Sequence, residues 1–199
     1  MSFRPRARVH LSGIAANWQA LDRLHPGATT AAVVKADGYG LGAGRVSTAL
    51  AKAGCSTFFV AHLEEGTALR KALGAGPRIF VLNGPAADQI QTYRDAALTP
   101  VLSTEAQVAE WSHAPRGACA LHFDTGMNRL GLSPGMLAGQ REALQKLQPV
   151  LVMSHLACAD TPAHPLNQTQ LSRFTEIAAA FPDIPASLSA SSASPPPTG

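Results

Sequence analysis

Two stretches of the sequence place reactive side chains directly after an apolar run. Lys35 follows AAVV (31–34), and Arg129 lies in HFDTGMNRLG (122–131), which also contains Asp124. A lysine held at the end of a buried strand loses hydration, which favours its uncharged, nucleophilic amine. Such an amine can condense with an aldehyde to form a Schiff base. The planar fork of an arginine can hold a carboxylate in a fixed orientation.

Each of these residues also has a purely structural interpretation, and the local sequence leaves both open. Lys35 can extend to solvent along its apolar stem or pair with Asp37. Asp124 and Arg129 can form an ion pair that only braces their loop. His155, which follows VLVMS, is of a type that is more often structural than a ligand.

A metal site is not predicted from these residues. His122 and Asp124 share a strand face, because side chains two residues apart on a strand point the same way. However, no His-Glu-x-x-His pattern or other metal-ligand spacing accompanies them.

Short apolar or β-branched runs alternate with stretches that have helical periodicity. The expected strands are 29–36, 56–61, 78–83, 98–103, 118–124 and 149–155, with PASLS (185–189) beginning a seventh. The expected helices are 42–54, 63–74, 103–113, 133–147 and 167–181, and Ser103, Ser133 and Asn167 are their expected caps. Strands apolar on both faces, each followed by a helix, predict a parallel sheet wrapped by helices.

The repeated βα pattern predicts an α/β fold of the (β/α)₈ TIM-barrel type. No Rossmann glycine fingerprint supports the doubly wound alternative. Such a barrel typically needs about 250 residues, so we expect an incomplete barrel of about six to seven βα units over residues 1–188. The segment 189–199 is small, polar and proline-rich, which predicts a disordered low-complexity tail.

In such a barrel the carboxyl ends of the strands form one rim, where the functional residues lie. Lys35 and Tyr39, Asn83, the loop 124–129, and His155 with Asp160 all follow predicted strands. They are therefore expected to meet at that rim.

Composition excludes several other classes of protein. The formal charge of +3 comes from 16 basic and 13 acidic residues, which is too little for a nucleic-acid surface. No apolar run has the length of a membrane span, and the first residues do not resemble a secretory signal. The three cysteines, Cys55, Cys119 and Cys158, lack disulfide or zinc spacing, so we expect packing roles and a cytoplasmic location.

Three long segments resemble the signature segments of bacterial alanine racemases, in the same order. They are AVVKADGYGLGA, FDTGMNRLGL and VMSHLACADTPAHPLNQTQLSRF, and the resemblance extends from about residue 5 to 192. It implies the barrel of an amino-acid racemase that uses pyridoxal 5′-phosphate (PLP) and interconverts L- and D-alanine to supply peptidoglycan. It also implies a β-rich C-terminal domain and a homodimer.

The resemblance further implies a role for each matching residue. Lys35 matches the lysine that bonds to PLP and acts as one catalytic base, and Tyr39 matches a tyrosine that touches the cofactor phosphate. Arg129 matches the arginine that meets the substrate carboxylate. His155 matches a histidine that supports the cofactor ring's arginine partner, and Ser191 stands at a phosphate-binding serine.

The chain departs from the family pattern near its end. Ala190 stands where the family has an asparagine, and the resemblance ends after Ser192. The family's second catalytic base is a tyrosine of the C-terminal domain, which is absent here; only Tyr39 and Tyr93 are present. We therefore expect a truncated and impaired racemase, produced by a frame change or premature stop near codon 192.

Two alternatives remain open at this stage. One is a single-domain PLP-binding protein of cofactor homeostasis, which shares the barrel and the Schiff-base lysine but does not racemise. The other is a non-catalytic fragment.

Overall fold

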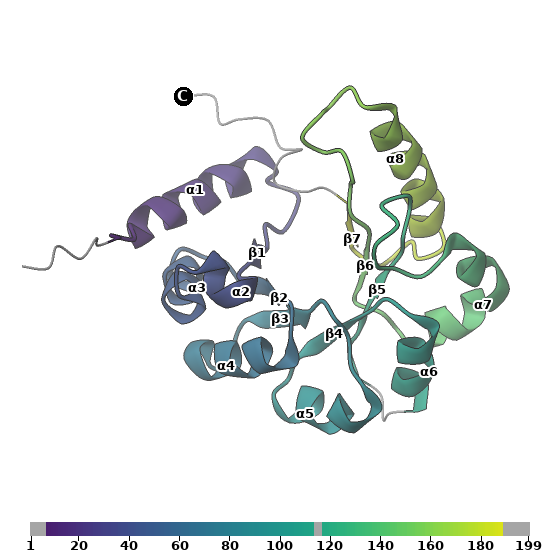
Figure 1. Cartoon of the computed structure of the whole chain (residues 1–199), viewed down its shortest axis with the longest axis horizontal. Helices are drawn as coiled ribbons and strands as arrows, with labels where there is room; N and C mark the ends of the chain where they lie inside the picture. The colour runs from purple at the N-terminus through teal and green to yellow at the C-terminus, as the bar shows by residue number, and fades with distance from the viewer. Residues whose placement is uncertain (1–6, 114–116, 189–199) are drawn as a thin grey trace, which may run out of the picture.

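A curled sheet of parallel strands lies at the centre of the structure, a computed structural model that describes residues 7–113 and 117–188 (Figure 1). Its strands pair in chain order, and every pairing is parallel. They are β1 (Ala32–Val33), β2 (Thr57–Val60), β3 (Arg78–Val81), β4 (Thr99–Leu102), β5 (Ala120–His122), β6 (Leu151–Met153) and β7 (Ala186–Ser187). The predicted α/β fold and the six to seven βα units are confirmed.

Helices form an outer ring around the sheet (Figure 1). They are α1 (Leu11–Leu24), α2 (Lys35–Tyr39), α3 (Ala43–Lys52), α4 (Leu63–Leu73), α5 (Ile90–Asp95) after a 3₁₀ turn at Ala87–Gln89, α6 (Glu105–His113), α7 (Pro134–Lys146) and α8 (Pro165–Ala178). No helix within the described ranges has the length and hydrophobicity needed to cross a membrane. The domain boundary at residue 188 stays a prediction, and the tail 189–199 lies outside the described residues.

Three sequence predictions need correction. Helices α1, α2 and α5 lie outside the predicted helical ranges, and β1 is much shorter than the predicted 29–36 because the chain turns away after Val34. The predicted cap Asn167 lies inside α8, whose N-terminus is capped by His164. Asn167 instead donates through Nδ2 to the carbonyl of Cys158 in the preceding loop.

The other two predicted caps lie at or next to the observed ones. Ser133 caps α7 and accepts a hydrogen bond from the backbone N–H of Met136. At α6 the side chain that accepts is Thr104, whose Oγ1 binds the N–H of Gln107, rather than the neighbouring Ser103.

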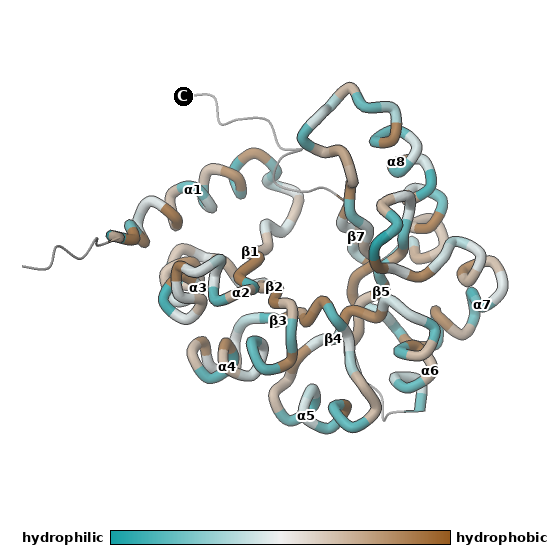
Figure 2. The backbone as a smooth tube through the Cα atoms, in the orientation of Figure 1, coloured by the Kyte–Doolittle hydropathy of each residue, from teal (hydrophilic) through white to brown (hydrophobic). Residues whose placement is uncertain are grey.

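Both faces of the sheet are apolar, as expected for strands that carry helices on one side and line a barrel on the other. Phe58 and Leu121 pack outward among the helices, whereas Phe59 and Ala120 belong to a smaller inner cluster. The inner Phe59 and Phe80 rings stack at 4.7 Å. In Figure 2 the central strands are mostly brown, the hydrophobic colour, whereas hydrophobic and hydrophilic colours alternate along the outer helices.

The rim loops after β1 and β2 are joined by one side chain from α4. The Glu65 carboxylate accepts from the backbone N–H of Ala36 at 2.6 Å, of Ala61 at 2.7 Å and of His62 at 3.0 Å. Partial burial alone would raise the pKa of Glu65, but these N–H donors outweigh it and lower the pKa. Glu65 therefore binds the Lys35 loop to its neighbour in its charged form.

A second side chain, from α6, joins the next two loops in the same way. The Gln107 amide donates to the Asn83 carbonyl at 2.7 Å and accepts from the Ser103 N–H at 2.8 Å. The loops joined by Glu65 also contact the loops joined by Gln107, because the Asn83 amide lies 3.1 Å from His62 Nδ1. Ser103 Oγ lies 3.4 Å from His122 Nδ1, which extends the network to β5.

A third side chain, Gln170 of α8, joins the loops after β5 and β6. Its amide binds Thr125 on one loop and His155 and Ala157 on the other. Side chains of α4, α6 and α8 thus join the rim loops in three pairs. The pairs follow β1 and β2, β3 and β4, and β5 and β6.

We predict that Leu144→Ala lowers the free energy of unfolding by about 2–5 kcal/mol, because it leaves a cavity in the core. Leu144 is fully buried in α7. The matched control is Leu171→Ala, because Leu171 is 46% exposed on α8. Urea unfolding followed by circular dichroism measures both, and equal losses for the two variants would contradict the described core.

We predict that Glu65→Gln destabilises the protein at neutral pH by an amount that shrinks in acid. A carboxyl group whose folded pKa is lowered contributes stability above its unfolded pKa, about 4.3, and loses it as the pH falls toward the folded value. The difference in unfolding free energy between the two proteins is thus full at about pH 6 and smaller below about pH 4. Urea titrations across this range measure it.

The control for this prediction is Glu64→Gln, which changes the exposed neighbour of Glu65 on the same helix turn. Its difference from the unmodified protein stays small and follows no such pH dependence. A Glu65→Gln difference that is the same at every pH would show that the charge of Glu65 does not hold the loops.

Candidate functional site

Lys35 stands at the start of a left-handed turn that follows β1. Ala36, Asp37 and Gly38 have φ of 52°, 51° and 63°, and Tyr39 has φ of 55°. Left-handed backbone costs about 1–2 kcal/mol for a residue with a side chain. Such strain persists only where surrounding contacts impose it, and it is concentrated at functional sites.

Hydrogen bonds hold this turn in its strained form. The Gly38 N–H donates to the Val34 carbonyl at 2.9 Å, and Glu65 holds the N–H of Ala36. Asp37 Oδ1 accepts from the N–H of Ala43, the first residue of α3, at 2.8 Å. Asp37 therefore anchors the turn to α3, which argues against the structural alternative in which it pairs with Lys35.

The loop after β5, which carries Arg129, is closed at its base. Phe123 and Leu132 form an isolated parallel bridge, and the Leu132 N–H donates to the His122 carbonyl at 2.7 Å. Gly131 lies at this closure with φ of 135°, and a Cβ there would collide with the Asp124 backbone. Only glycine fits this crossing without displacing the backbone.

Asp124 organises the same loop from within. Its Oδ1 accepts from the N–H groups of Gly126, Met127 and Asn128 at 2.9, 2.9 and 3.1 Å. Partial burial would raise the pKa of Asp124, but these backbone donors outweigh it and lower the pKa. Among the described residues Asp124 makes no hydrogen bond to Arg129, so the loop is braced through the backbone and not through that ion pair.

Lys35, Arg129 and His155 come from three distant segments, and the charges of Lys35 and Arg129 both reach His155. Burial first, and then the positive charges of Arg129 and Lys35, lower the pKa of His155. The rim therefore brings these three predicted residues together. His155 is neutral at pH 7, since its pKa lies below the ordinary histidine value of about 6.5.

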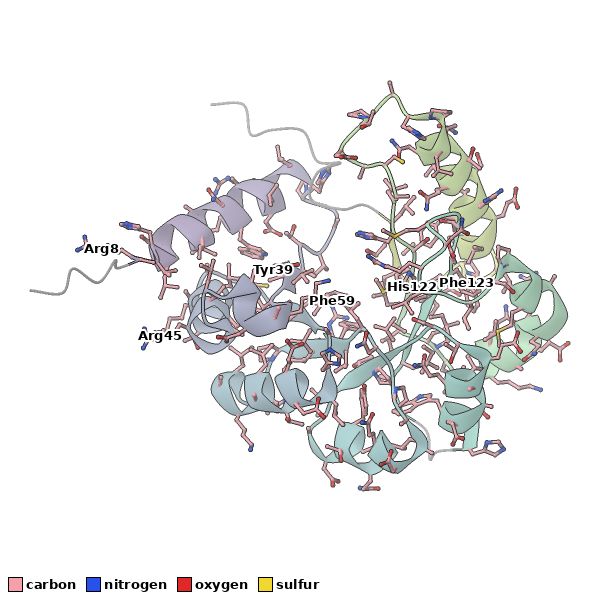
Figure 3. The ribbon with its side chains drawn as sticks, viewed as in Figure 1. Arg8, Tyr39, Arg45, Phe59, His122 and Phe123 are labelled. Carbon is pink, nitrogen blue, oxygen red and sulfur yellow. The ribbon has the colours of Figure 1, made fainter. Side chains whose placement is uncertain are left out.

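His122 faces the inside of the barrel from β5, two residues after the inward-facing Ala120. Figure 3 labels it on the side of the curl that carries β5, with Phe59 to its left and Tyr39 further left. Burial, with the nearby His155 and Arg129, lowers the pKa of His122 to about 4, and Asp124 opposes this only weakly. The imidazole is therefore neutral.

The acidic groups beside this rim are bound by the backbone. Asp37, Asp124 and Glu65 all accept hydrogen bonds from backbone N–H groups. Lys35 and Arg129 are the cations that follow β1 and β5. A phosphate or a carboxylate group has the complementary charge.

The remaining predicted residues lie at or near the rim with fewer contacts. Tyr39 is 63% exposed on the strained turn, so its hydroxyl is free to meet a ligand. Asn83 binds the neighbouring loops, and Asp160 is exposed in the loop after β6. Ser191 lies outside the described residues.

The second tyrosine is remote from this chemistry. Tyr93 is fully buried in α5 and donates through its hydroxyl to the Gly84 carbonyl at 2.9 Å. Burial raises its pKa. Tyr93 therefore serves the core and not the ligand space.

Residues 7–113 and 117–188 contain no group of three or more His, Cys, Asp or Glu side chains that could hold a metal ion. Cys55 and Cys119 are buried, and burial raises the pKa of Cys119 to about 12. A thiol with so high a pKa is unreactive at neutral pH. The packing role predicted for these two cysteines is therefore confirmed.

Sequence patterns did not identify Glu65 and Gln170 as parts of the site. Glu65 has a weak signal, because an acidic residue in the first turn of a helix is a capping pattern. Gln170 has no local signal, because its partners lie 13 to 45 residues away.

Comparison with known proteins identifies the family of the chain. Residues 9–195 match the family model described as alanine racemase, N-terminal domain. The chain is 52% identical over 167 residues to an alanine racemase of Jannaschia sp. The aligned region covers 83% of this chain and 48% of that protein. It is 48% identical over 190 residues to an alanine racemase of Rhodospirillum rubrum, covering 90% of this chain and 50% of the relative.

Solved structures give the same result. A Bartonella henselae alanine racemase with covalently bound pyridoxal phosphate superposes with a TM-score of 0.82 at 31% identity, over 89% of this chain and 54% of that one. The biosynthetic alanine racemase of Pseudomonas aeruginosa superposes with a TM-score of 0.81 at 32% identity. The match covers 92% of this chain and 52% of that one. The chain spans about half the length of the curated relatives it matches. The family match over residues 9–195 and these similarities show that the chain belongs to the alanine racemase N-terminal domain family.

Proposed function

We propose that this chain binds PLP at the rim and contributes the Lys35 side of an alanine racemase site. The observation that carries the proposal is the meeting of Lys35, Arg129 and His155 beside carboxylates that are already bound to backbone N–H groups. PLP carries an aldehyde and a phosphate, so it suits both the amine and the positive charge of this space. The covalently bound cofactor of the Bartonella henselae relative supports the choice.

Each residue then has a role that follows from its position. Lys35 would hold the aldehyde group of PLP through Nζ, and the strained turn fixes the lysine backbone directly after β1. Tyr39, exposed on the same turn, donates its hydroxyl to the phosphate. Ser191, by resemblance, binds the phosphate as well. His155 is neutral and provides a hydrogen-bonding group without adding a third charge.

Substrate binding and proton transfer follow from the same set. Arg129 holds the carboxylate of a small amino acid, proposed to be alanine, in a fixed plane. When bound, PLP withdraws electrons from the substrate α-carbon, which makes the α-proton removable. Lys35 would be the base that takes this proton on one face.

The proton for the opposite face has no evident donor in this part of the protein. Tyr39 is assigned to the phosphate, and Tyr93 is fully buried against Gly84. We therefore propose that complete racemisation, and with it D-alanine supply for peptidoglycan, uses a group outside the described residues, in a homodimer. The cytoplasm is the proposed compartment.

A second candidate function follows from the same observation. With one base and one bound cofactor, the chain on its own is suited to PLP binding and proton exchange without inversion. A PLP-homeostasis protein would stop at binding, and a non-catalytic fragment would not bind. The two experiments below separate these cases.

We predict that PLP attaches to Lys35 and is locked there by borohydride. The labelled peptide is identified by mass spectrometry, and one equivalent of label is expected at residue 35. Lys35→Ala loses the label, whereas Lys52→Ala, which changes an exposed lysine at the end of α3, retains it. Labelling spread evenly over the exposed lysines would overturn the proposed site.

We predict that the PLP-loaded chain exchanges the α-proton of alanine with deuterium oxide faster than it racemises alanine. A positioned acid or base contributes about 10²–10⁴ in rate, so the absence of one on the second face slows inversion by that order. Proton NMR measures exchange and chiral chromatography measures inversion. Equal rates would show that a second base is present, and exchange that survives Lys35→Ala would remove Lys35 from the reaction.

A further inference from the structure

We propose that Gln170 of α8 is a positioning residue that sets the Arg129 loop and His155 at the correct separation. The proposal deepens the proposed function and rests on it, because Arg129 and His155 are the groups assigned to the substrate and the cofactor. Gln170 touches neither ligand, and it acts through the two loops that carry these side chains.

The contacts of Gln170 use its whole amide group. Nε2 donates to Thr125 Oγ1 at 3.1 Å and to the His155 carbonyl at 2.8 Å, while Oε1 accepts from the Ala157 N–H at 2.9 Å. The side chain has no exposed surface. Because a backbone carbonyl and a backbone N–H are both engaged, the orientation of the amide is determined by its partners.

Thr125 is the point at which the other loop is held. Its Oγ1 also lies 2.7 Å from Ser154 Oγ, and its carbonyl accepts from the Arg173 guanidinium at 2.9 Å. Arg173 lies one turn after Gln170 on α8. A Cβ at Gly126 would come within 3.4 Å of Gln170 and closer to Arg173, so this glycine lets the loop lie against the helix.

The hydrogen bonds of Gln170 differ from ordinary core packing because they join the two loops that carry Arg129 and His155. Glu65 and Gln107 join other pairs of rim loops in the same manner. Of these three pairs of loops, only the pair joined by Gln170 carries both Arg129 and His155. A buried amide with all its partners satisfied is costly to disturb, since each orphaned partner loses its hydrogen bond in a place without water.

The test compares Gln170→Met with Gln145→Met. Methionine keeps the length of the side chain and removes the amide. Gln145 donates to the Ala180 carbonyl at 2.8 Å, so the control removes a side-chain hydrogen bond that lies away from the rim loops. The first readout is the titration of the His155 imidazole by NMR in protein without PLP, assigned from the spectrum of His155→Asn. The second is the apparent dissociation constant of PLP.

We expect Gln170→Met to raise the pKa of His155 toward its ordinary value, because the imidazole becomes less buried and moves away from the charges of Arg129 and Lys35. PLP binding weakens roughly tenfold. Gln145→Met lowers the melting temperature but leaves both readouts near those of the unmodified protein. If the two variants lose stability alike and neither readout moves in Gln170→Met, Gln170 is only structural and the proposal fails.

A milder pair of variants covers the case in which Gln170→Met does not fold. Thr125→Val removes the hydroxyl that Gln170 binds, and Thr125→Ser keeps it. The proposal expects the valine variant to shift the His155 titration and the serine variant to restore it, and equal behaviour of the two would overturn it. The His155 titration needs no PLP, so its result stands apart from the proposed function, which fails separately if the unmodified protein does not capture PLP at Lys35.

Discussion

The site depends on how the backbone groups of the rim loops are satisfied. Loops that leave a parallel sheet expose N–H and C=O groups that must find partners. Here Glu65, Gln107 and Gln170 supply many of them from helices outside the barrel, each binding the loop of its own strand and the loop before it. The rim is thereby organised before any ligand binds, which is the condition under which fixed groups can act on a reacting atom.

The same hydrogen bonds determine the charge of the rim. A carboxylate that accepts several N–H groups remains ionised, yet its charge is directed at the backbone. Glu65 and Asp124 both behave in this way, and burial keeps His122 and His155 neutral. One network therefore fixes both the positions of the rim loops and the charge of the groups along them.

Strain at the Lys35 turn has a place in this scheme. Ala36 and Asp37 adopt left-handed backbone that residues with side chains normally avoid, and the contacts from Glu65 and Ala43 compensate for it. The turn ends β1 abruptly, so Lys35 is held close to the sheet while Tyr39 is carried out to the exposed edge. A regular extension of the strand would have separated these two side chains along the strand axis.

The sequence by itself determined the strands, most of the helices and the rim positions of Lys35, Arg129 and His155. These follow from local patterns, since apolar runs on both faces and capping residues act within a few residues of the chain. Tertiary structure alone decided that Asp124 binds backbone, that Asn167 lies inside α8, that Ala36 turns left-handed and that Gln170 joins two loops. The physical reason is that these outcomes depend on hydrogen-bond partners distant in the chain or on competition between several nearby donors, and neither leaves a periodic signal in the sequence.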